Sequence, residues 1–211
     1  MGQQARRGKR EPILFTTGHF QLSNPRLTIQ KPSYKRSNTE ITVDTVFGKL
    51  VEAELQRHGV DVWNQVEVTS IQTVGDELAV SGTHGFSKTV DFVLVAVGVQ
   101  PNSELGATAG AALGARGSLR VTRRMETNLP DVYAAGDCVE TWHRLLNRYA
   151  YLPLGTTAHK QGRIAGENAV GGNREFEGSL GTQVVKLFDL VIARTGLRYG
   201  EASRRLRPVY R

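Results

Sequence analysis

The first periodic pattern of apolar residues is helical, and it follows a long aperiodic start. Residues 1–40 sustain no period of two or 3.6, and prolines interrupt them repeatedly, so we expect a mostly irregular segment. Asp44 can then cap a helix that ends at His58-Gly59, because glycine favours the left-handed turn that closes a helix. The apolar stripe of this helix comprises Phe47, Leu50, Val51 and Leu55.

Between residues 60 and 98 the pattern is that of strands. Apolar residues from Val60 to Ile71 alternate with polar ones, and Leu78–Val80 resumes the pattern after a Gly75-Asp76 turn, which predicts a small antiparallel meander. Phe92–Val97 is instead a continuous apolar run that ends at Gly98. Such runs are typical of strands buried on both faces of an α/β sheet.

The second half of the chain combines short extended segments with one long helix. Leu119–Thr122 and Val132–Ala135 are strand candidates on either side of a turn region. Thr156–Val170 is expected to be a helix, and Thr182–Val185 and Leu187–Ile192 are expected to be strands of a further unit. Small side chains in the helix permit close approach, either of a packed sheet or of a bulky ligand. These small residues are Ala158, Gly162, Ala165 and Gly166.

The net charge of +7 belongs to the two ends of the chain. Residues 1–40 carry eight Lys or Arg against two Glu, residues 198–211 carry five Arg against one Glu, and the body between them is mildly acidic. Basic tails attract phosphate or anionic lipid without specificity, so nucleic-acid binding stays a weaker alternative. No apolar run approaches the roughly 20 residues of a membrane span, and no signal-peptide core follows the basic start. We therefore expect a cytoplasmic protein without membrane contact.

Titratable side chains form no catalytic pattern in the sequence. Cys138 is the only cysteine, which excludes an internal disulfide and a Cys-x-x-Cys redox pair within this chain. We expect it to pack as a small buried apolar group. Four histidines have no partners visible in the sequence and are expected to be ordinary surface or helix-end residues, namely His58, His84, His143 and His159. No catalytic residue and no metal ligand is therefore assigned.

The most specific pattern lies between Thr127 and Asp137. A threonine is followed after six residues by Ala134-Ala135-Gly136-Asp137. This segment resembles the Thr, six residues, Ala-x-Gly-Asp pattern of flavoprotein disulfide reductases, the pyridine nucleotide-disulfide oxidoreductases. In that family a strand ends in a tight glycine turn, and the following carboxylate accepts a hydrogen bond from the ribityl chain of FAD. The resemblance implies that Gly136 and Asp137 bind FAD.

Three further blocks extend the resemblance over about residues 41–197. Upstream, Val95–Asn102 resembles the family's Ala-x-Gly-x-x-Pro-Asn junction, where the NAD(P)H domain returns to the FAD domain. The match implies that Val97 and Gly98 lie beside the nicotinamide path. Downstream, Gly181–Leu197 resembles the start of the interface domain in coenzyme A-disulfide reductases and related NADH oxidases, which implies a homodimer as one assembly.

The third block covers the start of the predicted helix. Pro153–Ala158 and the following Gln161-Gly162-Arg163 resemble the family helix whose amino-terminal backbone faces the pyrimidine edge of the flavin ring. A helix start offers unpaired N–H groups and partial positive charge, which suit the electron-rich edge of a reduced flavin. The resemblance implies FAD contacts for Leu154, Thr157 and Ala158.

The resemblance implies an α/β fold, with a partial FAD/NAD(P)-binding Rossmann-like (three-layer) architecture and the start of an α+β interface domain. The expected divisions are an irregular basic segment at 1–40, part of an NAD(P)H-binding domain at 41–98, the carboxy-terminal part of an FAD-binding domain at 99–175 and the start of the interface domain at 176–211. The sequence contains no Gly-x-Gly-x-x-Gly turn for either pyrophosphate, and the family's redox cysteine is absent. We therefore expect a chain that is truncated at both ends.

The chemistry implied by the family is hydride transfer from NAD(P)H to FAD, and then to a thiol, disulfide or oxygen acceptor. Because both pyrophosphate turns are missing, we expect an incomplete fragment with little or no activity alone, and the sequence leaves open whether the isolated chain is an enzyme. Two alternatives stay open. The chain is either a subunit completed by a separate chain that carries the amino-terminal FAD-binding half, or a binder of nucleic acid or anionic surfaces through its basic ends.

Overall fold

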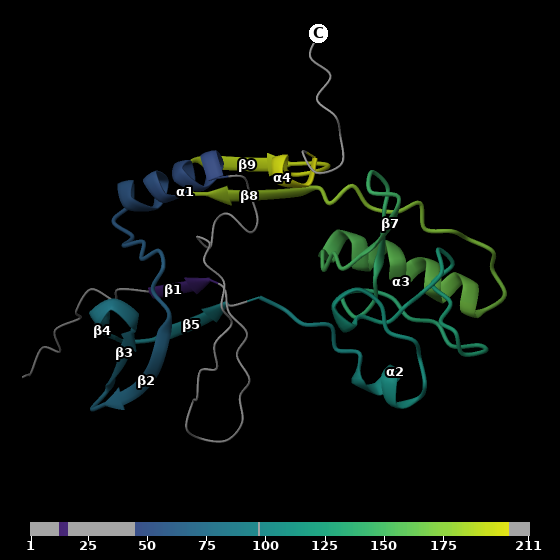
Figure 1. The fold of residues 1–211 in the computed structure, drawn as a ribbon, viewed down its shortest axis with the longest axis horizontal. Coiled ribbons are helices and arrows are strands. Elements are labelled where there is room, and N and C mark those ends of the chain that lie inside the picture. Colours follow the sequence, from purple (N-terminus) through teal and green to yellow (C-terminus); the bar gives the residue numbers. More distant parts are fainter. Residues whose placement is uncertain (1–12, 17–44, 97, 203–211) are drawn as a thin grey trace, which may run out of the picture. The chain divides into compact units, whose positions relative to one another are not determined.

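The computed structural model describes residues 13–16, 45–96 and 98–202 (Figure 1). The chain divides into two compact units, one that ends at Gly98 and one that begins at Val99. The assignment of these units to NAD(P)H and FAD domains stays a prediction, as does a separate interface domain from residue 176. The predicted cap at Asp44, the predicted site residue Val97 and most of the basic ends lie outside the described residues.

Helix α1 runs from Thr45 to Arg57 and ends where the sequence predicts. Gly59 adopts a φ of 75°, and its N–H donates to the carbonyl of Gln56 at 3.0 Å. The N–H of Val60 donates to the carbonyl of Leu55, also at 3.0 Å, which completes a Schellman motif. The glycine stop is therefore confirmed. Two residues of the predicted apolar stripe are about half exposed, namely Phe47 and Leu50.

A three-stranded antiparallel meander follows α1 in the first unit. It consists of β2 (Val68–Val74), β3 (Glu77–Gly82) and β4 (Ser87–Val90), in that order. The β2–β3 hairpin turns at Gly75-Asp76, as predicted, between the paired residues Val74 and Glu77. Val60–Val62 lies outside the strands, although the prediction included it in the meander. The buried side chains of the meander and its loops are Val68, Val80, Phe86 and Val90.

Strand β5 (Val93–Ala96) pairs in parallel with β1 (Ile13–Thr16). The sequence does not predict β1, which lies in the segment expected to be mostly irregular. It predicts β5, but the expectation of burial on both faces is wrong, because Leu94 and Val95 are 55% and 45% exposed. In the described part of the chain β5 has one partner strand, so it lacks the broad sheet of which such apolar runs are typical.

The core of the second unit lies against helix α3 (Gly155–Ala169), which confirms the predicted helix within one residue of each end. Its buried residues share one helical face, namely Thr157, Gln161, Ile164 and Asn168. The apolar cluster comprises Ala111, Leu119, Val121, Met125, Val139, Ile164 and Phe176. The shorter elements are α2 (Glu104–Thr108), β6 (Thr141–His143), β7 (Arg148–Ala150), β8 (Gln183–Leu187), β9 (Leu190–Arg194) and α4 (Tyr199–Ala202).

The two strands predicted at Leu119–Thr122 and Val132–Ala135 are wrong. Only isolated bridges occur there, which join Leu119 to Leu113 and Val139, and Glu126 to Tyr133. The backbone groups are satisfied within tight local turns instead: the N–H of Met125 donates to the carbonyl of Thr122 at 3.0 Å. Asp131, with a φ of 59°, bends the chain before the second segment. A chain that turns this often cannot align enough residues for a ladder.

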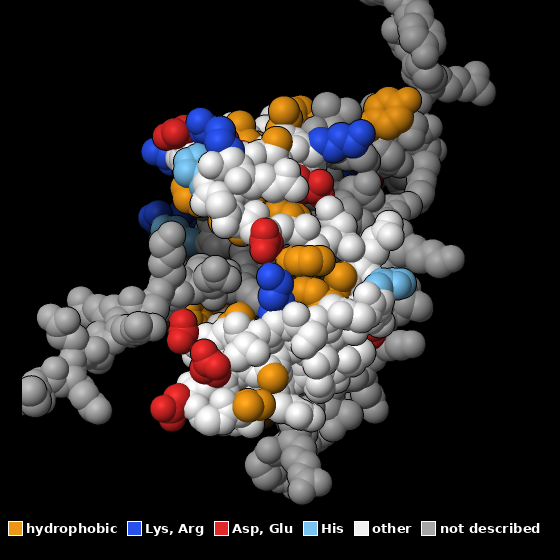
Figure 2. Space-filling view, turned by 90° about the vertical axis from the view of Figure 1, so that its left-hand side faces the viewer, with side chains coloured by type: hydrophobic (Ala, Val, Ile, Leu, Met, Phe, Trp, Pro, Cys, Tyr) orange, Lys and Arg blue, Asp and Glu red, His pale blue; other side chains and the backbone are white. Residues whose placement is uncertain are grey.

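The segments predicted as strands at Thr182–Val185 and Leu187–Ile192 form one antiparallel hairpin, β8–β9. The boundary of the second is wrong, because the hairpin turns at Phe188-Asp189. Phe188 has a φ of 50°, which a bulky residue rarely adopts. Because its side chain is apolar, the sequence pattern at this turn is the same as that of a continuing strand. Several apolar side chains of the hairpin are at least 45% exposed, namely Val184, Val185, Phe188 and Val191. Hydrophobic side chains, in orange, also reach the surface of the face shown in Figure 2.

None of the helices in the described ranges is long and apolar enough to cross a membrane.

Candidate functional site

The Gly136-Asp137 turn lies against helix α3. Gly136 has a φ of 92°, a left-handed conformation that strains any residue with a Cβ. A Cβ built at Gly136 would lie 3.7 Å from the Cβ of Ala158, which is ordinary contact. The backbone angle, rather than a lack of space, therefore requires glycine here. The turn is closed by a hydrogen bond from the N–H of Val139 to the carbonyl of Gly136, at 3.2 Å.

The turn leaves the carboxylate of Asp137 available to a ligand. Asp137 is exposed, and its side chain makes no hydrogen bond or ion pair with any residue in the described ranges. An ionised carboxylate accepts hydrogen bonds through both of its oxygens, so this group suits a ligand that carries hydroxyl donors. Asp137 therefore has the accessibility and the chemistry that its predicted role requires.

Helix α3 begins beside this turn with an amino terminus that no side chain caps. Leu154 occupies the N-cap position, makes no side-chain cap bond, and the first turn contains no acidic residue. The first intrahelical bond runs from the N–H of Ala158 to the carbonyl of Leu154, at 2.9 Å. The N–H groups of residues 155–157 therefore have no acceptor within the helix. Together with the helix dipole, they present donors and partial positive charge to an electronegative group.

A buried hydroxyl without a partner lies in the same region. The Oη of Tyr151 is buried and has no hydrogen-bond partner among the residues that the structure describes. Burial raises the pKa of Tyr151, and the charge of Asp137 raises it further, so this phenol lies within the field of the carboxylate. Buried polar groups in native proteins are nearly always hydrogen-bonded. A polar ligand bound at the turn would give the hydroxyl of Tyr151 a partner.

The structure gathers most of the predicted cofactor-binding residues within the second unit. These are Gly136, Asp137, Leu154, Thr157 and Ala158. The side chain of Thr157 is buried, with its Oγ1 at 3.5 Å from the Oγ of Ser179, so the backbone N–H is what Thr157 offers a ligand. Gly98, with a φ of 99°, belongs to the first unit. Val97 lies outside the described residues.

The sequence analysis assigns no role to two polar residues at this site: Gln161, which it names only as part of a matched block, and Tyr151. Gln161 is fully buried, and its Oε1 accepts a hydrogen bond from the N–H of Gly136 at 3.2 Å. One signal could have identified Gln161: it lies three residues before Ile164, on the helical face that carries the apolar contact. No comparable signal marks Tyr151, because it lies between β7 and α3 in a segment without periodicity.

Cys138 follows the turn and has the structural role that the sequence predicts. It packs against the apolar cluster of the second unit, and its Sγ lies 3.4 Å from the carbonyl oxygen of Ala135. Burial raises the pKa of the Cys138 thiol, and the neighbouring charge of Asp137 adds to this effect. A raised pKa disfavours the thiolate, which is the nucleophilic form of cysteine.

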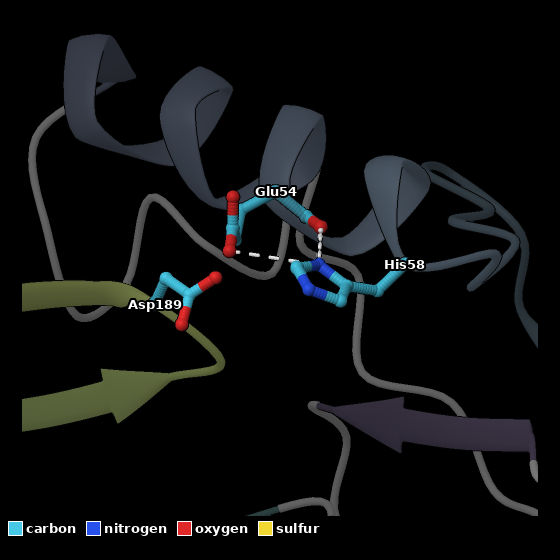
Figure 3. Close-up of side chains that lie close together, drawn as sticks. All are labelled: Glu54, His58 and Asp189. Atoms are coloured by element: carbon cyan, nitrogen blue, oxygen red, sulfur yellow. Dashed lines mark hydrogen bonds and ion pairs between the residues drawn. The ribbon is translucent and has the colours of Figure 1, made fainter.

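Three histidines fit the expected surface or helix-end positions. His84 and His159 are exposed. His58 lies just after α1, where its Nδ1 is 3.0 Å from the carbonyl oxygen of Glu54 and 3.5 Å from its carboxylate (Figure 3). A carbonyl oxygen only accepts hydrogen bonds, so Nδ1 of His58 carries the proton in this arrangement.

His143 does not fit, and its expected surface position is wrong. The residue is only 5% exposed, and it forms a parallel bridge with Ser179. The Nδ1 of His143 accepts a hydrogen bond from the N–H of Leu146 at 3.3 Å. The folded state therefore stabilises the neutral imidazole of His143 with its proton on Nε2.

Lowering the pH should destabilise the second unit through His143. Burial lowers the pKa of His143 below 6.5; Glu201 opposes this shift, and Arg148 and Arg194 add to it. The folded state thus binds the proton less tightly than the unfolded chain, so this stability is present above about pH 6.5 and is lost as the pH falls. We expect the melting temperature to fall between about pH 7.5 and 5.5, and less so in His143→Gln. An equal effect of His159→Gln, at the exposed control position, would contradict this assignment.

Comparison with known protein families identifies the family to which the chain belongs. The model of the family described as pyridine nucleotide-disulphide oxidoreductase matches residues 34–162, which is more than half of the sequence. The chain belongs to this family. The membership confirms the predicted family, and structural neighbours confirm the α/β class with a Rossmann-like fold.

Three similar proteins share 30% to 39% identity with this chain. It is 39% identical over 120 residues to the NAD(P)H sulfur oxidoreductase (CoA-dependent) of Pyrococcus furiosus, over 57% of this chain and 27% of that protein. The NAD-dependent persulfide reductase of A. fulgidus matches with a TM-score of 0.72 and 36% identity, over 77% of this chain and 30% of that one. An FAD-dependent pyridine nucleotide-disulphide oxidoreductase of Desulfovibrio vulgaris matches with a TM-score of 0.72 and 30% identity, over 78% of this chain and 42% of that one. The chain thus spans less than half the length of each of these proteins.

The site of this pyridine nucleotide-disulphide oxidoreductase family member fits a flavin cofactor. The carboxylate of Asp137 suits hydroxyl donors, and the uncapped start of α3 suits an electron-rich ring edge. The hydroxyl of Tyr151 is a third polar group that a ligand would satisfy. These groups suit the ribityl chain and the ring, whereas the sequence has no Gly-x-Gly-x-x-Gly turn for a pyrophosphate.

Proposed function

We propose that the second unit contributes the flavin-contacting part of an FAD-dependent NAD(P)H oxidoreductase. The observation that carries the proposal is the exposed carboxylate of Asp137, held on a glycine turn against the uncapped start of α3. The names of the similar proteins support it, since they include FAD-dependent and NAD(P)H-dependent enzymes. Bound FAD would accept a hydride from NAD(P)H and pass electrons to a thiol, disulfide or oxygen acceptor.

Each group of the site has a separate part in this proposal. The carboxylate of Asp137 accepts a hydrogen bond from a ribityl hydroxyl, while the glycine before it keeps the backbone close to the ligand. The N–H groups of residues 155–157, which follow Leu154 at the N-cap, face the pyrimidine edge and stabilise the negative charge that reduction places there. Ala158 leaves room beside Gly136 because its side chain is a single methyl group. The nicotinamide contacts expected of Val97 and Gly98 stay predictions from the family resemblance, and Val97 lies outside the described residues.

Flavin titration of the purified chain tests this function. The site contacts the ring and the ribityl chain but has no pyrophosphate turn, so we expect weak binding, with similar dissociation constants for FAD and riboflavin. Visible absorption spectra, recorded before and after addition of each flavin and then of NADH, measure this binding and any reduction. We expect little bleaching by NADH from the isolated chain.

The two ligands separate the possible results of this titration. Failure of both flavins to bind would contradict the proposed function. A band that the chain retains and NADH bleaches would show a working oxidoreductase and contradict the expectation of low activity. Tighter binding of FAD than of riboflavin by more than about tenfold would show a pyrophosphate site that the sequence motif does not reveal.

A second proposal is that this chain is a subunit completed by a separate chain that carries the amino-terminal FAD-binding half. Exposed apolar strands favour it: Leu94 and Val95 on β5, and Val184 and Val191 on the β8–β9 hairpin, are 45% to 67% exposed. Repeating the titration after co-expression with the corresponding half of a relative tests it. We expect the half to lower the FAD dissociation constant, with no matching gain for riboflavin. Equal affinities with and without it would contradict this proposal.

A further inference from the structure

Gln161 is an amide side chain buried completely inside the second unit. It lies on the inner face of α3 with an exposed fraction of 0%. Burial of an amide is unfavourable unless its polar atoms are hydrogen-bonded. Both ends of this amide have partners: Oε1 accepts from the N–H of Gly136 at 3.2 Å, and Nε2 donates to the Oγ1 of Thr141 at 3.1 Å. The orientation is unambiguous, because a backbone N–H can only donate and must face the oxygen.

The hydrogen bond from the N–H of Gly136 to Gln161 connects the glycine turn to helix α3. Gly136 faces α3 at two positions three residues apart: a Cβ at this glycine would lie 3.7 Å from the Cβ of Ala158, and its N–H donates to the Oε1 of Gln161. Thr141, the other partner of Gln161, begins strand β6 and is 1% exposed. One side chain on the helix therefore joins the turn and the strand to it through hydrogen bonds.

Asn168 shows that a buried amide on the same helix can serve another purpose. It is 2% exposed and lies two turns further along the buried face. Its Nδ2 donates to the carbonyls of Arg124 and Arg174, each at 2.8 Å, and its Oδ1 accepts from the N–H of Arg174 at 2.8 Å. Asn168 thus anchors loops at the other end of α3. It is a matched control for buried amide bonding without contact to the turn.

We propose that Gln161 is a positioning residue for flavin binding, because it fixes the direction in which the Gly136-Asp137 turn presents its carboxylate. This inference rests on the proposed function. Gln161 does not contact the ligand; it acts by holding the N–H of Gly136 one residue before Asp137. A rotation of the freed peptide would move the carboxylate away from the ribityl hydroxyl, and a hydrogen bond weakens steeply once its geometry is lost.

Two readouts on the full chain test this role. Gln161→Met keeps the volume of the side chain and removes both of its hydrogen bonds. At the control position, Asn168→Leu likewise keeps the volume and removes all three hydrogen bonds. Gln161→Asn is the second variant, because it keeps the amide but is too short to reach Gly136. It replaces the Met variant in both measurements if that variant does not fold. The first readout is the riboflavin dissociation constant, and the second is the hydrogen-exchange rate of the Gly136 amide, followed by NMR.

We expect both Gln161 variants to raise the dissociation constant about tenfold and to accelerate exchange at Gly136, while Asn168→Leu lowers the melting temperature and changes neither. Unchanged exchange at Gly136 would overturn the inference, as would an equal loss of affinity in Asn168→Leu. Failure of the wild-type chain to bind riboflavin would contradict the proposed function itself, and the exchange rates would still show whether Gln161 holds the turn.

Discussion

Replacing Asp137 by Ala should weaken riboflavin and FAD binding by about ten- to a hundredfold, because a hydrogen bond to a charged group contributes about 1.5–3 kcal/mol. The side chain of Asp137 is exposed and has no partner within the described ranges, so its removal costs the fold little. A loss of affinity in this variant therefore reflects a lost contact with the ligand rather than a loss of folded protein. Quenching of flavin fluorescence measures the dissociation constants, and the melting temperature verifies that the fold is retained.

Two further variants separate the hydrogen bond of Asp137 from its charge. Asp137→Asn keeps an acceptor oxygen without the charge, so we expect a loss of affinity smaller than that of the Ala variant. Asp131→Asn removes a charge from another exposed carboxylate, six residues earlier, and tolerates the φ of 59° at that position. If Asp131→Asn weakens binding as much as Asp137→Ala, the direct contact is disproved in favour of long-range charge.

Replacing Phe176 by Ala should lower the free energy of unfolding of the second unit by about 3–5 kcal/mol. Phe176 is 4% exposed and belongs to the apolar cluster beside α3. Its backbone is held on both sides, since its N–H donates to the carbonyl of Arg123 at 2.7 Å and its carbonyl accepts from the Nε of Arg123 at 2.9 Å. A backbone held in this way cannot collapse into the cavity, so the loss should lie near the upper end.

Urea unfolding, followed by circular dichroism, measures this loss. A change of this size is a large fraction of the roughly 5–15 kcal/mol by which domains are stable, so we expect the midpoint of unfolding to shift to a clearly lower urea concentration. Leu105→Ala is the matched control, because Leu105 lies in the same unit and is 87% exposed. We expect that control to change stability by less than about 0.5 kcal/mol. Equal losses in both variants would disprove the assignment of the core.

The elements that could be predicted from sequence are those whose signals are local. Helix α1 ends at Arg57 because the left-handed Gly59 closes its last turn. The β2–β3 hairpin turns at Gly75-Asp76, where two residues determine the connection. Helix α3 is predicted within one residue of each end. In each case the determinant lies within a short window of the chain.

The elements that could not be predicted depend on partners elsewhere in the chain. Strand β1 exists because it pairs with β5, far away in the sequence, and nothing within Ile13–Thr16 marks it as a strand beyond its apolar character. The apolar Phe188 occupies a left-handed turn position where the pattern indicates a strand. The preference of an apolar residue such as Phe188 for a strand is therefore overridden by tertiary contacts.

The residues of the candidate site also separate into those with local sequence signals and those that depend on distant partners. The motif at Ala134–Asp137 and the block at Leu154 identify residues on the turn and at the helix start, since short spacings specify both. The roles of Gln161 and Tyr151 depend on burial, which places one amide against the turn and leaves one hydroxyl without a partner among the described residues. His143 is buried and forms a bridge with Ser179, which likewise arises only when distant segments meet.

The parallel pairing of β1 with β5 also has a consequence for the order of folding. Ile13 pairs with Val93, so the intervening chain must close before these strands gain any hydrogen bond. The entropy of loop closure grows with loop length, at about 0.6 kcal/mol for each doubling, whereas the β2–β3 hairpin closes over two residues. Hairpins form within about 1–10 μs. The topology therefore favours a route in which the meander forms first and β1 adds last, onto a β5 that is already ordered.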